Sequence, residues 1–416
     1  MKRLLMILTL LIGVQSATAQ ETTPEPLIEQ QMDQLVQVTE ILRELDTLDS
    51  VERAFPTRDE VRAYLEDVYA RELPPEEIER WTALYVGLDL LPTNIDLRQV
   101  YVDLLSSQVA GFYDTDTEVM NVIPTLGDDP GDSLSLTEQI IFIHEYVHAL
   151  QDQHFDLDTF LDPEASPDTS LAMLSLVEGD ASAVMNLYAQ QVALQNPLAS
   201  LSILVEGVQA GNLFLPEGIP PVLLRELLFP YEDGLNFVIE VYGEGGWEAV
   251  DAAFDNPPTT TEHILHPETY LAGEAATDVA HEPLSVALGD GWVSLWDTTL
   301  GEFYVREHLR AFLGTSAAAE AAQGWGGDHF QLYRNETTGE IAWALRLAWD
   351  TVEDQREFAD AYAEWLSLRF EGARDGVCAF SPERAICFTD DASGSLITSA
   401  ATTTTAEALL EIAHTR

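Results

Sequence analysis

The stretch at residues 141–157, "IFIHEYVHALQDQHFDL", constrains the fold of this chain most strongly. His144 and His148 are four residues apart, and Glu145 lies between them. On a helix, residues four apart lie about 40° from each other, one turn up. Both imidazoles therefore point toward a common position and suit zinc as ligands, with Glu145 beside them as a base. The pattern predicts a helix that carries a metal site.

The residues in front of this stretch strengthen the helix prediction. Ser135 and Glu138 have the spacing of a capping box, in which each residue satisfies the other's backbone N–H. Ile140, Ile141 and Val147 provide an apolar side for packing.

A third ligand is required, and His154 is the first of two candidates. The run "HEYVHALQDQH" has the spacing HExxHxxGxxH of the metzincins, with His154 in the last position. Gln151 stands where that pattern has a glycine, which would let the chain turn sharply. In an unbroken helix His154 lies about 280° round from His144, away from the ligand side.

Glu178, in "LSLVEGDASAVM", is the second candidate and the one we favour. It follows His148 by thirty residues and lies in an apolar stretch with helical spacing, where a carboxylate is costly to bury unless it is paired or bound to a metal. Gly179 beside it leaves room for the first helix to approach. A His₂Glu set leaves zinc an open position, as catalysis requires.

These motifs also carry a family resemblance. "HEYVH" together with "VEGD" resembles the gluzincin clan of zinc metallopeptidases, whose third ligand is a glutamate on the following helix. With "AGFYD", "HEYVHALQDQHFDL" and "TTEHILHPETY", residues 85 to 275 look like a family of exported bacterial metallopeptidases with undefined substrates. The resemblance implies one zinc ion per chain on His144, His148 and Glu178, and peptide hydrolysis with Glu145 as general base. The clan's thermolysin-like members have an acidic residue one turn beyond the glutamate ligand. Here Ser182 stands there and Asp180 is nearer.

A peptidase of this type also needs a donor for the developing oxyanion. His263, His266 and Tyr270 fall in one segment after the two helices, and we predict His266 as the catalytic donor. The alternative is that "ILHPETY" is a structural corner. We expect an extended peptide or protein substrate to add itself to the strand at residues 119–123.

The organisation of the chain predicts an α+β fold. Residues 1–19 have the layout of a secretory signal peptide cleaved after Ala19, and residues 20–26 form a linker. A mostly helical segment to about residue 107 and a hairpin or edge strand at 111–123 belong with a zincin-like catalytic domain over 27–275. We expect residues 20 to about 100 to cover or support its cleft, or to form a plain structural layer. Residues 276–416 are expected to form a C-terminal α+β domain.

Cysteine and charge limit the compartment and the partners. Cys378 and Cys387 are close together, which in an exported chain indicates a disulfide. The net charge of −53 becomes −55 once Lys2 and Arg3 leave with the signal peptide. Such a surface repels nucleic acid and anionic lipid, and we expect no stable membrane insertion after signal removal. The competing functions are a non-catalytic, metal-stabilised binding module and a metal hydrolase acting on non-peptide amide or cell-wall bonds.

Overall fold

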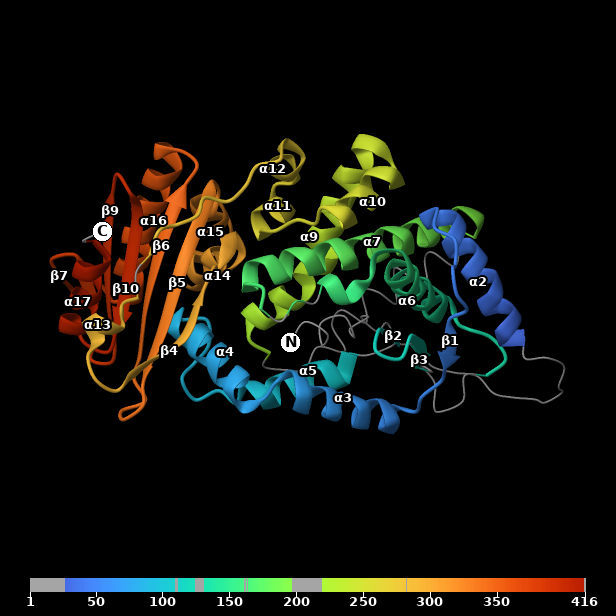
Figure 1. Cartoon of the computed structure of the whole chain (residues 1–416), viewed down its shortest axis with the longest axis horizontal. Helices are drawn as coiled ribbons and strands as arrows, with labels where there is room; N and C mark the ends of the chain where they lie inside the picture. Colours follow the sequence, from blue (N-terminus) through green and yellow to red (C-terminus); the bar gives the residue numbers. More distant parts are fainter. Residues whose placement is uncertain are drawn as a thin grey trace. The chain divides into compact units, whose positions relative to one another are not determined.

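The computed structural model describes residues 27–414 except 109–110, 124–130, 161, 163, 197–218 and 282. The expected signal peptide and linker lie outside these residues. The chain divides into two compact units, and the expected α+β class is confirmed (Figure 1). In the described part, none of the helices is long and apolar enough to cross a membrane.

The first unit comprises residues up to Pro74, Asp96–Glu164 and Ala172–Pro258. Its elements are α2 (Leu27–Arg43), β1 (Glu52–Ala54), α3 (Arg58–Glu72), α5 (Leu97–Gln108), β2 (Gly111–Asp114), β3 (Val119–Val122), α6 (Leu136–Phe155), the 3-10 helix η1 (Leu157–Phe160), α7 (Pro167–Gln195), whose first turn belongs to the second unit, α9 (Pro221–Gly245) and α10 (Trp247–Asp255).

A small sheet in this unit has the strand order β1-β3-β2. The predicted hairpin is confirmed, since β2 and β3 pair in antiparallel fashion. Strand β1 was not expected, because it lies inside the segment predicted as helical and pairs in parallel with β3. A strand of three residues is too short to show a hydrophobic period, so only its distant partner defines it.

Helix α6 begins as the sequence predicts. The Ser135 side chain accepts a hydrogen bond from the Glu138 N–H at 3.2 Å, and the Ser135 N–H donates to Glu138 Oε2 at 2.7 Å. The capping box is therefore confirmed. Helix α6 continues without a break to Phe155 and ends at Asp156, which has the left-handed conformation (φ 56°).

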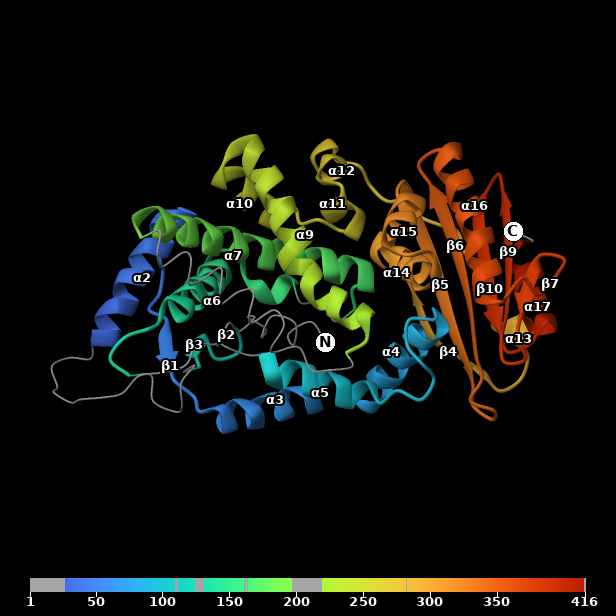
Figure 2. The ribbon, with the colours of Figure 1, turned by 180° about the vertical axis from the view of Figure 1, so that it is seen from behind.

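Helices α7 and α9 cross each other (Figure 2), and their backbones touch at two glycines. A Cβ atom on Gly179 would lie 2.2 Å from the Gly234 carbonyl oxygen, and one on Gly234 would lie 2.3 Å from the Ser175 carbonyl oxygen. The expectation that Gly179 admits the first helix is therefore wrong: its partner is α9. The sequence around Gly179 does not reveal this partner, because the contact also requires Gly234 on a later helix.

The second unit comprises Pro75–Ile95, Ala165–Leu171 and Thr259–Arg416. Its elements are α4 (Pro75–Gly87), α11 (Thr261–Leu265), α12 (Pro267–Ala272), α13 (Ser285–Leu288), β4 (Trp292–Thr298), α14 (Gly301–Leu313), α15 (Thr315–Ala322), β5 (Trp325–Asn335), β6 (Ile341–Trp349), α16 (Val352–Arg369), β7 (Arg374–Asp375), β8 (Cys378–Phe380), β9 (Ala385–Asp391), β10 (Gly394–Ala400) and α17 (Thr403–His414). The strands form an antiparallel sheet in the order β4-β5-β6-β10-β9-β8-β7. Helices α14 and α16 contact one face, and α17 packs on the other.

The boundary between the units differs from the one expected at residue 275. Thr261 belongs to the second unit, because its Oγ1 accepts a hydrogen bond from the Phe303 N–H of α14 at 3.1 Å. Residues 75–95 also belong there: Trp343 on β6 donates its indole N–H to the Gly87 carbonyl at 2.9 Å. Both contacts join segments far apart in the chain, which composition and turn signals do not reveal.

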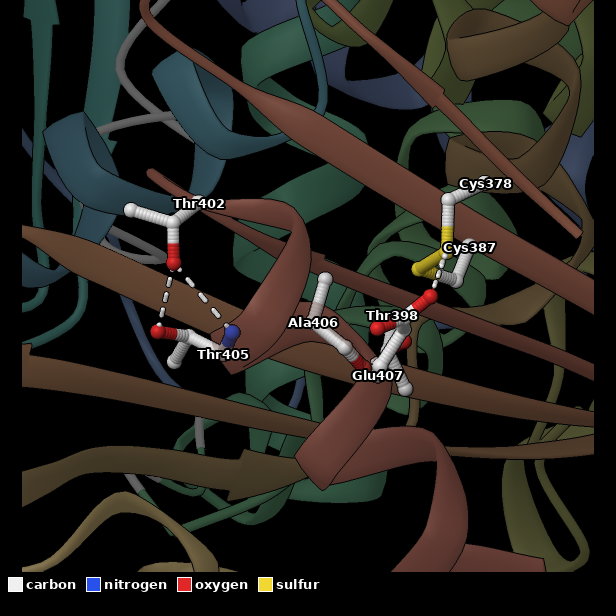
Figure 3. The surroundings of a disulfide bond; sticks show 7 residues. All are labelled: Cys378, Cys387, Thr398, Thr402, Thr405, Ala406 and Glu407. Carbon is white, nitrogen blue, oxygen red and sulfur yellow. Dashed lines mark hydrogen bonds between the residues drawn. A yellow bond between two sulfur atoms is a disulfide. The ribbon is translucent and has the colours of Figure 1, made fainter. Parts of the chain in front are cut away.

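The predicted disulfide between Cys378 and Cys387 is confirmed. The two residues are register partners on β8 and β9, and both are fully buried. Figure 3 shows the bond close to Thr398 of β10, whose hydroxyl donates to the Ala406 carbonyl of α17 at 2.8 Å. The disulfide therefore lies in the core of the second unit, where the sheet meets its last helix.

Candidate metal centre

Three side chains from α6 and α7 converge in the interior of the first unit. Glu178 Oε2 lies 3.0 Å from His144 Nε2 and 3.4 Å from His148 Nε2, and the two imidazole nitrogens are 3.1 Å apart. All three residues are buried. The structure thus brings together the three ligands proposed from the sequence.

The donor set fits a zinc ion. Ligand atoms about 2.1 Å from a tetrahedral zinc lie roughly 3.4 Å apart, close to the three separations observed. The two imidazole nitrogens lie 3.1 Å apart, a separation that either a shared proton or a common cation explains. Glu178 Oε1 is buried and has no hydrogen-bond partner among the described residues. A cation held by His144, His148 and Glu178 would account for these features.

His154, the other candidate ligand, lies elsewhere. Because α6 continues past Gln151, His154 stands in the last turn of the helix, where its Nε2 donates to the Asp46 carbonyl at 2.8 Å. It is outside the group whose ligand atoms converge.

Gln151, which replaces the metzincin glycine, has a part in the centre. Its Oε1 accepts from His148 Nδ1 at 2.8 Å, which leaves His148 Nε2 for the metal. Its Nε2 donates to Asp180 Oδ2 and to the Val177 carbonyl, each at 2.9 Å. Asp180 is therefore linked to His148 through Gln151, from a position two residues beyond Glu178.

Arg43 completes this support from α2. Its Nε donates to both carboxylate oxygens of Asp180, at 2.7 and 3.0 Å, and its second amino group donates to Asp251 at 2.7 Å. The guanidinium lies 4.6 Å from the ring centre of Trp247, and the residue is fully buried. Sequence reasoning missed Arg43, although a basic residue on the apolar side of a helix requires buried acidic partners.

The environment of Glu145 suits proton transfer. Burial raises the pKa of Glu145 to about 8, although the Tyr113 N–H donates to its Oε2 at 3.1 Å. Burial lowers the pKa of His144. Burial also acts to lower the pKa of His148. The negative charge of Glu178 and its hydrogen bond to His148 outweigh this effect and raise the pKa of His148 to about 9.

Gly111 explains how strand β2 comes so close to Glu145. A Cβ atom at Gly111 would lie 3.2 Å from Glu145 Cγ and 3.0 Å from Ile141 Cγ2. A larger residue would push the strand away from α6.

The expectation that a substrate pairs with the strand at residues 119–123 is wrong. Strand β3 is central, paired with β1 on one side and β2 on the other, so it has no free edge. Among the described residues, β2 is an edge strand, and its Tyr113 N–H points outward to Glu145. The hydrophobic pattern identified the hairpin but not which of its strands lies at the edge.

Tyr231 on α9 was not predicted, yet it lies against the ligands. Its ring stacks on His144 with 5.9 Å between ring centres. Burial and the carboxylates of Glu178 and Glu145 raise the pKa of Tyr231 well above its usual value, so the hydroxyl keeps its proton. Pro230 and Gly234 could have drawn attention to this part of the sequence, because proline and glycine are unusual in a helix interior.

The segment expected to supply the oxyanion donor belongs to the second unit, where its side chains have partners. His266 Nε2 lies 3.2 Å from Glu302 Oε1, and Arg306 contacts both residues. His263 donates to the Glu274 carbonyl at 3.0 Å and packs against Tyr270. These contacts agree with the alternative that the segment is a structural corner.

Comparisons with known proteins give one family match. The model of a domain of unknown function (DUF8575) matches residues 293–410, within the second unit. No curated protein and no solved structure matches the chain.

Proposed function

We propose that this protein is an exported zinc metallopeptidase of gluzincin type. The observation that carries the proposal is the convergence of His144, His148 and Glu178 beside a buried Glu145. A metal that only stabilises a fold needs no such base, which argues against a metal-stabilised binding module. Bound zinc would act as a Lewis acid and lower the pKa of a water molecule to about 7.

Glu145 is the proposed general base. Its buried carboxylate lies on the same helix as the two histidines and beside them, where it can accept the proton of the attacking water and then give that proton to the leaving amine. The Tyr113 N–H holds the carboxylate in place and orients it toward the ligand side of α6.

Tyr231 is the oxyanion donor that the contacts of the first unit favour, while His266 stays a prediction from the sequence. The Tyr231 hydroxyl stays protonated beside the ligands, as a donor to a developing negative charge must.

The substrate is proposed to bind in extended form along β2, an edge strand among the described residues, through outward backbone groups other than the Tyr113 N–H, which is bound to Glu145. In an antiparallel pair, backbone groups of alternate residues face outward, so Gly111 and Tyr113 share the outer side. Recognition through the backbone fits a peptide with little side-chain preference.

An extracytoplasmic location follows from the layout of residues 1–19 and fits the disulfide. The charge of the chain argues against a nucleic-acid partner.

The test is a Glu145→Gln variant, assayed with casein and a peptide library after zinc loading. The amide keeps the shape of the side chain and leaves the ligands intact, so zinc content should stay unchanged while turnover falls by about 10²-fold or more. Glu240→Gln, the same change at an exposed position on α9 of the first unit, is the matched control and should cleave normally. A wild-type protein that holds zinc but cleaves no peptide bond would contradict the peptidase assignment.

A further inference from the structure

Two neighbouring strands of the second unit present a second group of metal-ligand side chains. Asp297 on β4 is the register partner of Gln331 on β5, and His329 lies two residues from Gln331. Because side chains alternate along a strand, these three residues share one face of the sheet. His281, from the segment before β4, lies over the same place.

The ligand atoms of the two histidines and the aspartate lie close together. Asp297 Oδ1 is 2.7 Å from His329 Nε2 and 3.8 Å from His281 Nε2. The imidazole rings are parallel, with 3.3 Å between their centres. All three ligand atoms lie within 4.8 Å of one another.

Outer hydrogen bonds leave one ligand atom of each residue available to a cation. Gln331 Nε2 donates to Asp297 Oδ2 at 3.0 Å, so Oδ1 faces the histidines. His281 Nδ1 donates to the Val279 carbonyl at 3.3 Å, which leaves its Nε2 without a proton when the ring is neutral. Metal-binding histidines and carboxylates are usually fixed by such outer partners.

A simple ion pair does not account for this arrangement. His329 Nε2 is buried and lacks an aligned hydrogen bond among the described residues, although Asp297 Oδ1 is only 2.7 Å away. An ion pair with Asp297 would need only one of the two histidines. If both were protonated, the two imidazolium cations would repel each other at a ring separation of 3.3 Å. Two neutral imidazoles and a carboxylate around a cation satisfy all three groups.

We propose that His281, Asp297 and His329 form a second metal site, which takes a first-row divalent transition ion such as Zn²⁺. Imidazole and carboxylate donors suit these ions, and His281 is exposed enough to turn its ring toward the common point. Three protein ligands leave coordination positions open. A cavity of about 120 Å³ lined by both histidines, Gln331 and Arg346 adjoins the site and admits water or a small ligand. This site is independent of the proposed peptidase activity.

The test counts metal ions in the full-length protein, loaded with Zn²⁺ and freed of weakly held metal by dialysis against a mild chelator. Wild type should retain two ions per chain, and His329→Ala and Asp297→Asn should each retain one. His281→Ala is a second test at an exposed position, where loss of folding is not a concern. His414→Ala is the matched control, because His414 forms an exposed pair with Asp391 in the same unit and should retain both ions.

The Glu178→Ala variant distinguishes this second site from the metal centre of the first unit. It should lose one ion, and the double variant with His329→Ala should lose both. A wild-type protein with a single ion that Glu178→Ala removes and His329→Ala leaves in place would overturn the second site. A single ion with the reverse response would support the second site and contradict the proposed metal centre. Co²⁺ substitution, read by visible absorption, would show which variant loses which site.

Discussion

At the scale of single residues, Glu178 and His154 are the two positions that separate a gluzincin from a metzincin arrangement. Glu178 lies among the ligands, whereas His154 contacts a backbone carbonyl. In a chain that also carries His329→Ala, so that only the metal centre is counted, Glu178→Ala should lose zinc and activity together. Two imidazoles alone hold zinc weakly.

His154→Ala in the same background should keep its zinc, with at most a modest fall in melting temperature. A Glu178→Ala chain that still binds zinc at the centre and cleaves peptide would return the third-ligand role to His154.

Tyr231 gives a second prediction at this scale. Tyr231→Phe keeps the ring on His144 but removes the hydroxyl. Loss of one oxyanion donor should reduce kcat by about 10²–10³-fold, with little change in KM or zinc content. Tyr242→Phe, at an exposed position on the same helix, is the control. Equal activity of both variants would show that the donor is another group.

At the scale of elements, the crossing of α7 and α9 sets the distance between the ligand Glu178 and Tyr231. Gly234→Ala would force a Cβ atom against the Ser175 carbonyl and push the helices apart. Overpacking of this kind costs about 1–3 kcal/mol. We therefore expect a lower melting temperature and lower kcat.

Gly243→Ala on the same helix is the matched control for this prediction, because a Cβ atom there meets nothing within 4 Å. It should be neutral or slightly stabilising, since alanine is the better helix former. If the two substitutions behave alike, helix propensity and not the crossing governs the result.

Local sequence patterns predicted single helices and strands better than they predicted which of these elements pack together. The ligand spacing and the Ser135 capping box depend on residues close in sequence, and each is found in the structure. The central position of β3, the partner of Gly179 and the support from Arg43 depend on residues far apart in the chain. A hydrophobic period carries no information about such pairings, which is why these features were missed or misassigned.

At the scale of the whole molecule, buried acids make stability depend on pH. In the second unit, burial raises the pKa of Asp168 to about 7, of Asp328 to about 6 and of Glu262 to about 9. The folded state therefore binds more protons than the unfolded chain, whose carboxyl pKa values are about 4. The stabilisation is complete below pH ~4 and is lost as the pH rises through the folded values.

The melting temperature should accordingly fall between about pH 4 and 9, as measured by circular dichroism at constant salt. Asp168→Asn preserves an acceptor for Thr261 but removes one titrating group, so its curve should be flatter. An Asp168→Asn curve parallel to that of the wild type would contradict this account.

Arg43 also bears on the order in which a translocated chain matures. On the proposed export route, α2 emerges early, whereas Asp180 and Asp251 follow much later. Until both have emerged, the guanidinium has no partners and stays in water, because burying it alone is too costly. Helix α2 is thus tied into the first unit through Arg43, and on the proposed export route the proposed metal centre would gain this support only after residue 251 has emerged.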